Sequence, residues 1–258
     1  MATQSRKSRR QEQILETLLL NPTQRVHQLA QTLRVSAETV RRDLAELAEG
    51  GKLSRTYGGA LRTQQFEPAL SERLLLKVRE RQAIARQAAQ RLGNMDVLMI
   101  GGGATTLHFA RAIRRLNHPM TVITPAYSVA QELSRNPCFE VMCLPGIFEG
   151  KEGLVCGPEA IKAIERFHVP VAVLGASGVS REGVSEALLS AGQVYQAIMA
   201  NSDQVFVLAD GSKFNKRALT LLGPWQSNIT LVTDVQPSGE LQTAISQGRV
   251  LVEVATLE

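Results

Sequence analysis

The feature that most constrains the fold is an alternation between short apolar runs and helix-like segments. Seven apolar runs rich in Val, Ile and Leu lie at residues 97–100, 121–124, 141–144, 171–174, 205–209, 229–233 and 250–254. Continuous apolar runs that alternate with helices are typical of β-α-β units, whose parallel strands are buried on both faces. The sequence therefore predicts an α/β domain with a mainly parallel sheet over residues 93–258.

Ligands bind such sheets at the loops that follow the carboxyl ends of the strands. Three loops qualify, at residues 101–106 (GGGATT), 175–183 (GASGVSREG) and 210–214 (DGSKF). The first loop lacks the lysine of a Walker A motif, and it lacks the third glycine and the later acidic residue of a dinucleotide fingerprint. It predicts a smaller phosphorylated ligand, bound by backbone N–H groups of residues 102–106 and by two threonine hydroxyls. A glycine turn that only allows close packing is the alternative.

Asp210 and Lys213 add a second part to this candidate site. Asp210 follows the apolar run VFVLA, so its carboxylate should emerge at the carboxyl edge of the sheet. A carboxylate suits sugar hydroxyls and an ammonium suits phosphate, whereas a surface Asp–Lys pair in a turn is the alternative. The candidate effector-binding residues are Gly101, Gly102, Gly103, Ala104, Thr105, Thr106, Gly175, Asp210 and Lys213.

The net charge of +5 lies entirely in the first quarter of the chain. Residues 1–62 hold eleven Lys and Arg against six Asp and Glu, and residues 63–258 hold eighteen of each. This asymmetry predicts a polyanion-binding module attached to a neutral domain; a basic surface without a partner is the alternative. Aromatic residues make up only 4% of the chain and none stands in a basic stripe, so duplex DNA is favoured over single strands.

Three helical patterns follow one another in this first quarter. Their apolar stripes are Ile14, Leu15, Leu18 and Leu19, then Val26, Leu29, Ala30 and Leu33, then Val40, Leu44 and Leu47. Ser36 stands where an N-cap is needed for the third helix, and the two residues before it leave room only for a tight turn. The pattern predicts a helix-turn-helix with its core at residues 25–44.

The third helix carries the predicted DNA-binding side chains. With its apolar stripe buried, a rotation of about 100° per residue turns Glu38 and Arg42 outward and places Thr39 and Arg41 on the flanks. Arg42 is the candidate for base contact, because guanidinium groups bond guanine edges in pairs. Ser36, Thr39 and Arg41 are the candidates for backbone contact. Pairing of both arginines with acidic residues of the same helix is the alternative.

The segment KLSRTYGGALR after this helix predicts a small β-ribbon, or wing. Lys52 and Arg55 are available to solvent there. A basic wing of this kind contacts phosphate, so both residues should add affinity and salt dependence rather than sequence choice.

Residues 66–92 predict a stiff connecting helix. Apolar residues recur at helical spacing, with dense charge between them, at Leu74, Val78, Ala85, Ala88 and Leu92. The predicted organisation is thus a winged helix-turn-helix domain over residues 1–62, mainly α with a small β wing, a connecting helix over residues 63–92, and an effector-sensing α/β domain over residues 93–258.

The run VSAETVRRDLAELAEGGKLSRTYGGA resembles the N-terminal domain of the DeoR-type family of bacterial transcription regulators. In that family a VS-x-x-T-(I/V)-RRDL recognition helix leads to a wing that closes in a (H/Y)GGA turn. The resemblance extends over nearly the whole chain and implies a winged helix-turn-helix that reads operator DNA. It also implies a sensor that is similar in fold to sugar-phosphate isomerases, with an effector site formed by a D-S-G-T-T-T loop, a G-G-I-D-type loop and a D-S-S-K-F segment.

The sensor matches these family motifs in part. Gly101 stands where the family has an acid, and Ala104 stands where it has a hydroxyl residue. Residues 124–125 are Thr-Pro where the family tends to have Thr-Asn, and residues 144–146 are Leu-Pro-Gly where it tends to have a glycine pair. The missing acid and asparagine would bond sugar hydroxyls, so the identity of the effector stays open. The matching positions are Gly103, Thr105, Thr106, Asp210, Ser212, Lys213 and Phe214.

Together these features predict a sequence-specific DNA-binding transcription regulator, a repressor of a carbohydrate-metabolism operon that responds to a phosphorylated sugar or related metabolite. One small head covers few base pairs, so a homodimer or homotetramer on double-stranded operator DNA is expected. We expect a cytoplasmic protein, because the N-terminus is charged and no run of eighteen uncharged apolar residues occurs.

No enzymatic activity, cofactor or metal site is expected. The histidines show no metal-ligand spacing and are scattered at His27, His108, His118 and His168. The alternative is a sugar-phosphate isomerase-like enzyme with an appended DNA-binding head. It would need a general base, for which Glu182 and Glu186 are the candidates.

Overall fold

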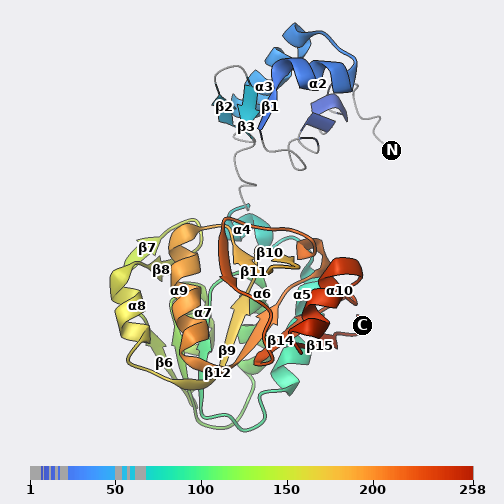
Figure 1. The fold of residues 1–258 in the computed structure, drawn as a ribbon. Helices are drawn as coiled ribbons and strands as arrows, with labels where there is room; N and C mark the ends of the chain where they lie inside the picture. The colour runs from blue at the N-terminus through green and yellow to red at the C-terminus, as the bar shows by residue number, and fades with distance from the viewer. Residues whose placement is uncertain are drawn as a thin grey trace. The chain divides into compact units, whose positions relative to one another are not determined.

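The computed structural model describes residues 7, 9–11, 13–14, 17, 23–49, 54–56, 59–61 and 68–257. By its contacts the chain divides into two units, Met1–Phe66 and Glu67–Glu258. Both are drawn in Figure 1, and each is described below by itself.

The first unit contains a helix-turn-helix. Helix α2 (Val26–Leu33) and helix α3 (Ala37–Glu49) are joined by a turn in which Arg34 is left-handed, with a φ of 53°. The predicted apolar stripes meet in one core, which includes Ile14, Leu29, Val40, Leu44 and Leu47. The helix-turn-helix prediction is therefore confirmed; Leu15, Leu18 and Leu19 of the first stripe lie outside the described residues.

A three-stranded antiparallel sheet accompanies these helices. Strands β2 (Ser54–Thr56) and β3 (Gly59–Leu61) pair as the predicted ribbon, with Arg55 opposite Ala60. Strand β1 (Thr23–Arg25) pairs with the other edge of β3. No prediction placed a strand there, because the tripeptide Thr-Gln-Arg has no apolar alternation, and the strand follows from its pairing with β3.

The second unit is built on a seven-stranded parallel sheet with the order β15-β14-β12-β9-β4-β5-β6. Each apolar run of the sequence supplies one strand, so the predicted α/β fold is confirmed. The strands are β4 (Val97–Ile100), β5 (Met120–Thr124), β6 (Phe139–Cys143), β9 (Val169–Gly175), β12 (Ser202–Leu208), β14 (Ile229–Thr233) and β15 (Leu251–Val254).

The strand order reverses between β4 and β9. The chain enters the sheet at β4, adds β5 and β6 on one side, and then returns to β9 on the other side of β4. Loops that leave neighbouring strands in opposite directions open a crevice at the carboxyl edge, which is the usual ligand position in such sheets.

Helices cover both faces of this sheet (Figure 1). On one face, α5 (Val78–Gln90) packs on α6 (Ala104–Ile113), which in turn packs on α7 (Tyr127–Leu133). Helices α8 (Pro158–Ile164) and α9 (Leu189–Ala200) pack together on the other face. Right-handed crossovers that run in opposite directions along the sheet require this arrangement. Helix α10 (Gly239–Gln247) joins β14 to β15.

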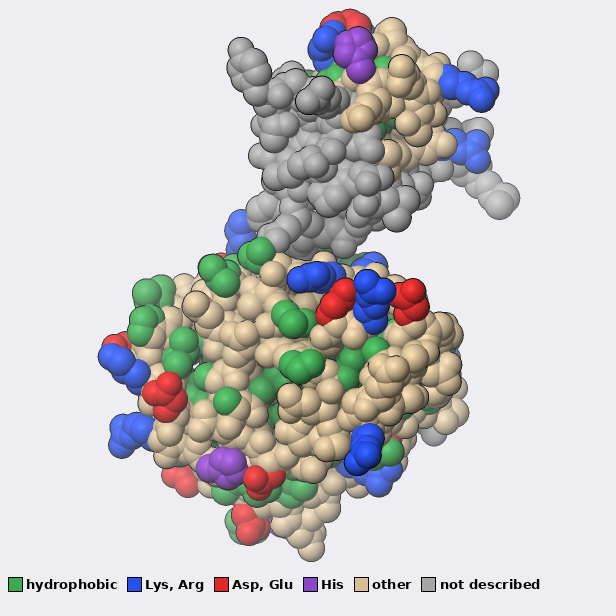
Figure 2. Space-filling model, viewed as in Figure 1, with side chains coloured by type: hydrophobic (Ala, Val, Ile, Leu, Met, Phe, Trp, Pro, Cys, Tyr) green, Lys and Arg blue, Asp and Glu red, His purple; other side chains and the backbone are tan. Residues whose placement is uncertain are grey.

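Short elements follow the strands at the carboxyl edge. They are the hairpin of β7 (Ile147–Glu149) and β8 (Leu154–Cys156), the small sheet of β10 (Gly178–Ser180), β11 (Gly183–Glu186) and β13 (Thr220–Gly223), and the 3-10 turn η1 (Gly211–Lys213). Figure 2 shows Lys, Arg, Asp and Glu mixed over one face of this unit, in keeping with its balanced charge. Among the described residues, no helix is long and apolar enough to cross a membrane.

The prediction of a single connecting helix over residues 63–92 is wrong. The part from residue 68 onward contains two helices of the second unit, α4 (Leu70–Arg73) and α5, which are separated where Lys77 is left-handed with a φ of 53°. Helix α5 is not a free rod, because Ala83, Ile84 and Ala88 are buried against the sheet and α6. The sequence predicted a connector from the dense charge between its apolar residues, but the apolar stripe is wide enough to pack α5 against the sheet.

Replacing Ile84 with alanine should destabilise the second unit. Its side chain is fully buried, so Ile84→Ala should lower the free energy of unfolding by about 2–5 kcal/mol, measured by urea denaturation. Gln82→Ala, an exposed change on the same helix, should stay within about 0.5 kcal/mol of the wild type. Equal effects of the two substitutions would show that α5 does not belong to the core.

Candidate DNA-reading surface and effector site

Helix α3 begins with a side-chain cap. Ser36 Oγ accepts a hydrogen bond from the Thr39 N–H at 3.1 Å and lies 2.8 Å from Thr39 Oγ1. This bond satisfies one of the N–H groups that have no acceptor in the first turn. Glu38, Arg41 and Arg42 are exposed on the outer side of the helix that follows. The structure thus places these five predicted DNA-binding residues within the first two turns.

The acidic residues on α3 are held by the N-terminal helical segment. Asp43 is buried and accepts two hydrogen bonds from Arg10, at 2.5 and 3.1 Å. Glu46 accepts a hydrogen bond from Lys7 at 2.7 Å, which lowers the pKa of that carboxyl. Neither carboxylate depends on the arginines of α3 for a partner.

Among the described side chains, the arginines of α3 form one ion pair on their own helix. Arg41 Nη1 lies 3.4 Å from Glu38 Oε2, and an ion pair between two exposed side chains contributes little. Arg42 is exposed, and of the three acids within four residues of it, Asp43 is bound by Arg10, Glu46 by Lys7, and Glu38 lies beside Arg41. Both arginines thus remain exposed beside acids that have other partners, and their contact with DNA stays a prediction.

The two wing residues stay predictions. Lys52 lies outside the described residues. Arg55 lies on β2, but only its backbone belongs to the described part of the chain.

A cavity at the carboxyl edge of the large sheet brings the three predicted loops together. Its lining includes residues that follow β4, β9 and β12, three strands that are neighbours in the sheet. The cavity thus lies where the strand order reverses, which we call the β4–β9 switch point. The predicted effector-binding residues in its lining are Gly102, Gly103, Ala104, Thr105, Gly175 and Lys213.

Gly101 and Thr106 support the loop and do not line this cavity. A Cβ added to Gly101 would lie 2.7 Å from Leu174 Cδ2, so close packing requires glycine there. Thr106 is fully buried and its hydroxyl donates to the Gly103 carbonyl at 3.0 Å. The packing alternative therefore holds for these two positions.

Gly102 is already hydrogen-bonded within the protein. Its N–H donates to Tyr195 Oη at 3.1 Å, and the Tyr195 hydroxyl lies at the same distance from the Gly102 carbonyl. Burial raises the pKa of Tyr195 well above its ordinary value, so the hydroxyl stays a donor. The backbone N–H groups of Ala104 and Thr105, in the first turn of α6, have no acceptor within the helix. They are the better candidates for binding an anion.

Two buried arginines enter the cavity from α4 and α5. Arg73 Nη2 lies 2.5 Å from Glu152 Oε2 on the β7–β8 turn. Arg81 Nε lies 3.3 Å from Asp210 Oδ2, and Arg81 Nη1 donates to the Arg73 carbonyl. Both side chains are at least nine-tenths buried. They link the first helices of this unit to the loops at the carboxyl edge.

Sequence reasoning missed both arginines because they were assigned to the connecting helix and not to the site. One signal could have found Arg81, which falls on the apolar stripe of Val78, Ala85 and Ala88 at spacings of three, four and seven residues. A charged residue on a buried stripe needs a partner. The stripe does not reveal which partner it has.

Asp210 lies behind the lining and holds these groups in place. Burial opposes its ionisation, but the hydrogen bond from Ser212 and the charges of Arg81 and Lys213 outweigh burial and lower the pKa of Asp210. Its Oδ1 accepts the Ser212 N–H at 3.1 Å. The predicted Asp–Lys pair is therefore not a simple surface pair, since Asp210 is 1% exposed.

The cavity has room for little more than one water molecule in this conformation. Its volume is about 30 Å³, because the guanidinium groups and their carboxylates occupy the space. Glu186 also lines it, with Oε1 held by the N–H groups of Ala187 and Leu188 at 2.9 and 3.2 Å. Within the described part of the chain, no three His, Cys, Asp or Glu side chains gather as a metal site would require.

Both units match known family models. The DeoR-like helix-turn-helix domain matches residues 10–66, and the DeoR C terminal sensor domain matches residues 76–235. The chain belongs to the DeoR family. It is accordingly a DNA-binding transcription regulator with a sensor domain, as the recognition helix and the α/β fold predict.

Relatives of this DeoR-family chain match over most of their lengths. The uncharacterized HTH-type transcriptional regulator YulB of Bacillus subtilis (strain 168) is 32% identical, over 87% of this chain and 88% of that protein. The HTH-type transcriptional repressor CsqR of Escherichia coli (strain K12) is 28% identical over 93% of each chain. The glycerol-3-phosphate regulon repressor of the same strain is 28% identical over 88% and 90%. All three names denote regulators, which supports a regulator over the enzyme alternative.

His108 lies on α6, one turn below the first loop of the effector site. It is buried, and its Nε2 has no hydrogen-bond partner among the described residues. Burial, followed by the charges of Arg111 and Arg81, lowers the pKa of His108 from 6.5 to about 4. The folded protein therefore keeps this ring neutral where the unfolded chain would bind a proton.

This difference predicts a loss of stability in mild acid. The pKa of His108 is lower in the folded protein than in the unfolded chain, so acid favours the unfolded chain. The free energy of unfolding should therefore fall as pH is lowered from 6.5 to about 4, by at most about 1.4 kcal/mol per pH unit. Urea denaturation across this range should show that the free energy of unfolding falls less steeply with decreasing pH for His108→Leu than for the wild type. The same slope in both proteins would contradict this assignment.

Proposed function

We propose that this chain represses a carbohydrate-metabolism operon and that a phosphorylated sugar or related metabolite binds at the β4–β9 switch point. The observation that carries the proposal is a convergence of positive groups on one cavity. Lys213, Arg73 and Arg81 meet there with the first turn of α6. Cationic side chains together with N–H groups at a helix N-terminus favour an anionic group such as a phosphate.

Carboxylates in the same cavity suit sugar hydroxyls. Glu152 and Glu186 line it beside the positive groups. They come from the β7–β8 turn and the end of β11, and not from the loop position where the family motif has an acid. We infer that these two residues bond the sugar hydroxyls in place of the acid that the family motif has at the position of Gly101.

Effector binding would compete with existing ion pairs. A phosphate that bonds Arg73 and Arg81 would compete with Glu152 and Asp210, their present partners, for the same guanidinium groups. Helix α4 is tied to the β7–β8 turn by the Arg73–Glu152 pair and by the Leu70 N–H, which donates to the Lys151 carbonyl at 3.1 Å. Since α4 is the first helix of the sensor after the DNA-binding unit, loosening it would alter how the reading heads are held.

Operator binding is assigned to the outer face of α3. Arg42 would contact base edges, and Ser36, Glu38, Thr39 and Arg41 would set the position of the helix, with phosphate contacts from Lys52 and Arg55 in the wing. We propose a homodimer or homotetramer, because paired heads are needed for tight and selective binding. The glycerol-3-phosphate regulon repressor is a relative whose name joins repression to a phosphorylated metabolite.

Footprinting on DNA upstream of the chain's own gene, with and without a panel of sugar phosphates, tests the proposal directly. We expect the protein to protect a DNA segment and one sugar phosphate to abolish that protection. If no sugar phosphate of the panel changes the protection, the proposed class of effector is wrong. Turnover of a pentose or hexose phosphate by purified protein would revive the enzyme alternative, with Glu186 as its candidate base.

Arg42→Ala should weaken operator binding by about 1–3 kcal/mol and reduce the preference for operator over unrelated duplex. Fluorescence anisotropy at constant salt measures both. The charge-matched control is Arg166→Ala, an exposed change after α8, which should bind as the wild type does. Effector-induced thermal stabilisation should survive in both variants. Operator binding by Arg42→Ala at the wild-type level would remove this residue from base contact.

Lys213→Gln should weaken binding of the sugar phosphate identified by footprinting by about 1.5–3 kcal/mol, because a hydrogen bond to a charged group is lost. Thermal shift and effector-induced release from operator DNA measure this loss. Binding to operator without effector should be unchanged. Lys216→Gln is the matched control, since Lys216 is exposed and does not line the cavity. Equal responses of the two variants would place the phosphate elsewhere.

A further inference from the structure

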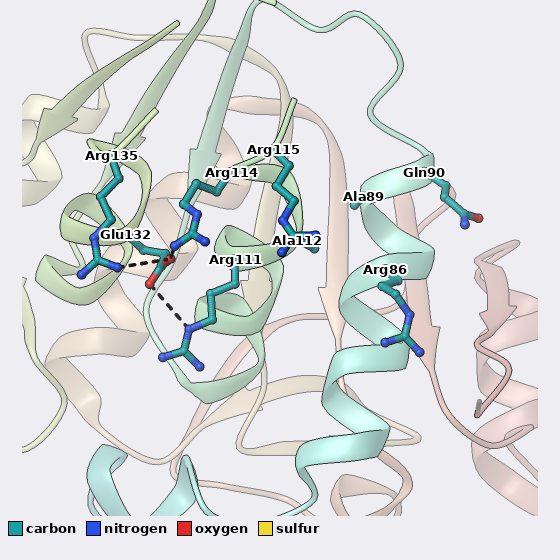
Figure 3. A pocket seen from close by; sticks show the side chains of 9 residues that line it. All are labelled: Arg86, Ala89, Gln90, Arg111, Ala112, Arg114, Arg115, Glu132 and Arg135. Carbon is teal, nitrogen blue, oxygen red and sulfur yellow. Dashed lines mark hydrogen bonds and ion pairs between the residues drawn. The ribbon is translucent and has the colours of Figure 1, made fainter. Parts of the chain in front are cut away.

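A second and larger cavity lies at the opposite edge of the sheet. It has a volume of about 680 Å³, within the roughly 300–1,000 Å³ typical of small-molecule sites. Its walls are the C-terminal parts of α5, α6 and α7 and the residues just after them (Figure 3). Each of these helices ends shortly before a strand begins, so this cavity lies at the amino edge and the effector cavity at the carboxyl edge.

Five arginines line this cavity, and among its described lining residues Glu132 is the one acid. The arginines are Arg86, Arg111, Arg114, Arg115 and Arg135. Glu132 is 8% exposed and lies beside three of them, bonded to Arg114 and within 3.6 Å of Arg111 and 3.9 Å of Arg135. Figure 3 shows these three around Glu132, with Arg86 on α5 across the hollow. The described lining of this cavity therefore contributes five positively charged side chains and one negatively charged one.

Helix capping does not explain this concentration of arginines. Cations are favoured near helix C-termini, where carbonyl groups lack partners. At the end of α6, however, Asn136 Nδ2 donates to the carbonyls of Arg114 and Leu116, at 2.8 Å each. The N–H groups of Arg114 and Leu116 donate to Ala110 and Ile113, which closes the last turn. The guanidinium groups are therefore not needed as caps there.

The geometry points to a binding site for a compact polyanion, a small molecule that carries two or more phosphate or carboxylate groups. Guanidinium groups from two helices, Arg86 on α5 and Arg111 and Arg115 at the end of α6, face a space whose lining between them includes the small Ala89 and Ala112. Planar guanidinium forks bond phosphate and carboxylate in pairs. A ligand with several charges would relieve the mutual repulsion of the arginines.

A small ligand fits this site better than duplex DNA. The arginines surround a hollow between helices, whereas a duplex needs a surface that follows two strands of phosphates. The site is also independent of the proposed effector, since it shares no lining residue with the cavity at the carboxyl edge.

Titration of inorganic triphosphate into the full chain by calorimetry, at about 0.15 M salt, tests this site. The variant is Arg86→Gln/Arg115→Gln, which removes exposed arginines from α5 and from the turn after α6 and leaves the three partners of Glu132 intact. Lys162→Gln/Arg166→Gln, at exposed positions on and just after α8, is the control with the same change in charge. Lys213→Gln reports on the effector site. Inorganic phosphate at equal ionic strength is the comparison for a single-anion site.

Saturable binding of triphosphate, tighter than that of phosphate, is expected for the wild type. It should be weakened at least about tenfold in Arg86→Gln/Arg115→Gln and unchanged in the other two variants. Without triphosphate, each variant should unfold cooperatively and at no lower a temperature than its control, which separates lost binding from lost folding. The proposal is overturned by the absence of saturable binding, by an equal loss in the α8 control, or by loss in Lys213→Gln alone. Weaker binding of the cavity variant to unrelated duplex, without triphosphate binding, would assign these arginines to DNA instead.

Discussion

Two buried guanidinium groups hold the start of the sensor domain against the carboxyl edge of its sheet. Arg81 joins α5 to the end of β12 through Asp210 and joins α4 through the Arg73 carbonyl, while Arg73 reaches the β7–β8 turn through Glu152. Removing one partner of a buried pair is expensive, because the remaining charge has no water to bind. A ligand that offers a replacement anion avoids this penalty. The interactions that close the site are therefore also the ones that an anionic effector can exchange.

The first loop of the proposed effector site combines residues needed for packing with residues that could bind an anion. Gly101 allows β4 to approach Leu174, and Gly102 exchanges hydrogen bonds with Tyr195, so neither is simply an open anion site. The groups that can bind a phosphate begin at Ala104, where the first turn of α6 points at the cavity. Packing therefore accounts for Gly101, and the proposed anion binding falls to the residues that follow Gly102.

Parallel α/β architecture gives the same helices two chemically different ends. The first turn of α6 offers N–H groups to the carboxyl edge, and its last turn offers arginines to the amino edge. At the first end the partial charge of the helix favours an anion; at the second the side chains must supply all of the positive charge. Helix α5 lines both cavities, with Arg81 near its beginning and Arg86 one and a half turns later.

The sequence by itself determined the two-unit organisation, the helix-turn-helix, the seven strands and six of the residues that line the effector cavity. Those features follow from local periodicity and from the rule that parallel strands end at a common edge, and both can be read along the chain. The partners of Arg73 and Arg81 and the arginine-lined cavity were decided only by the tertiary structure. Periodicity reveals that one side of a helix is buried; which distant side chains meet there depends on how the helices pack, and no local pattern records that.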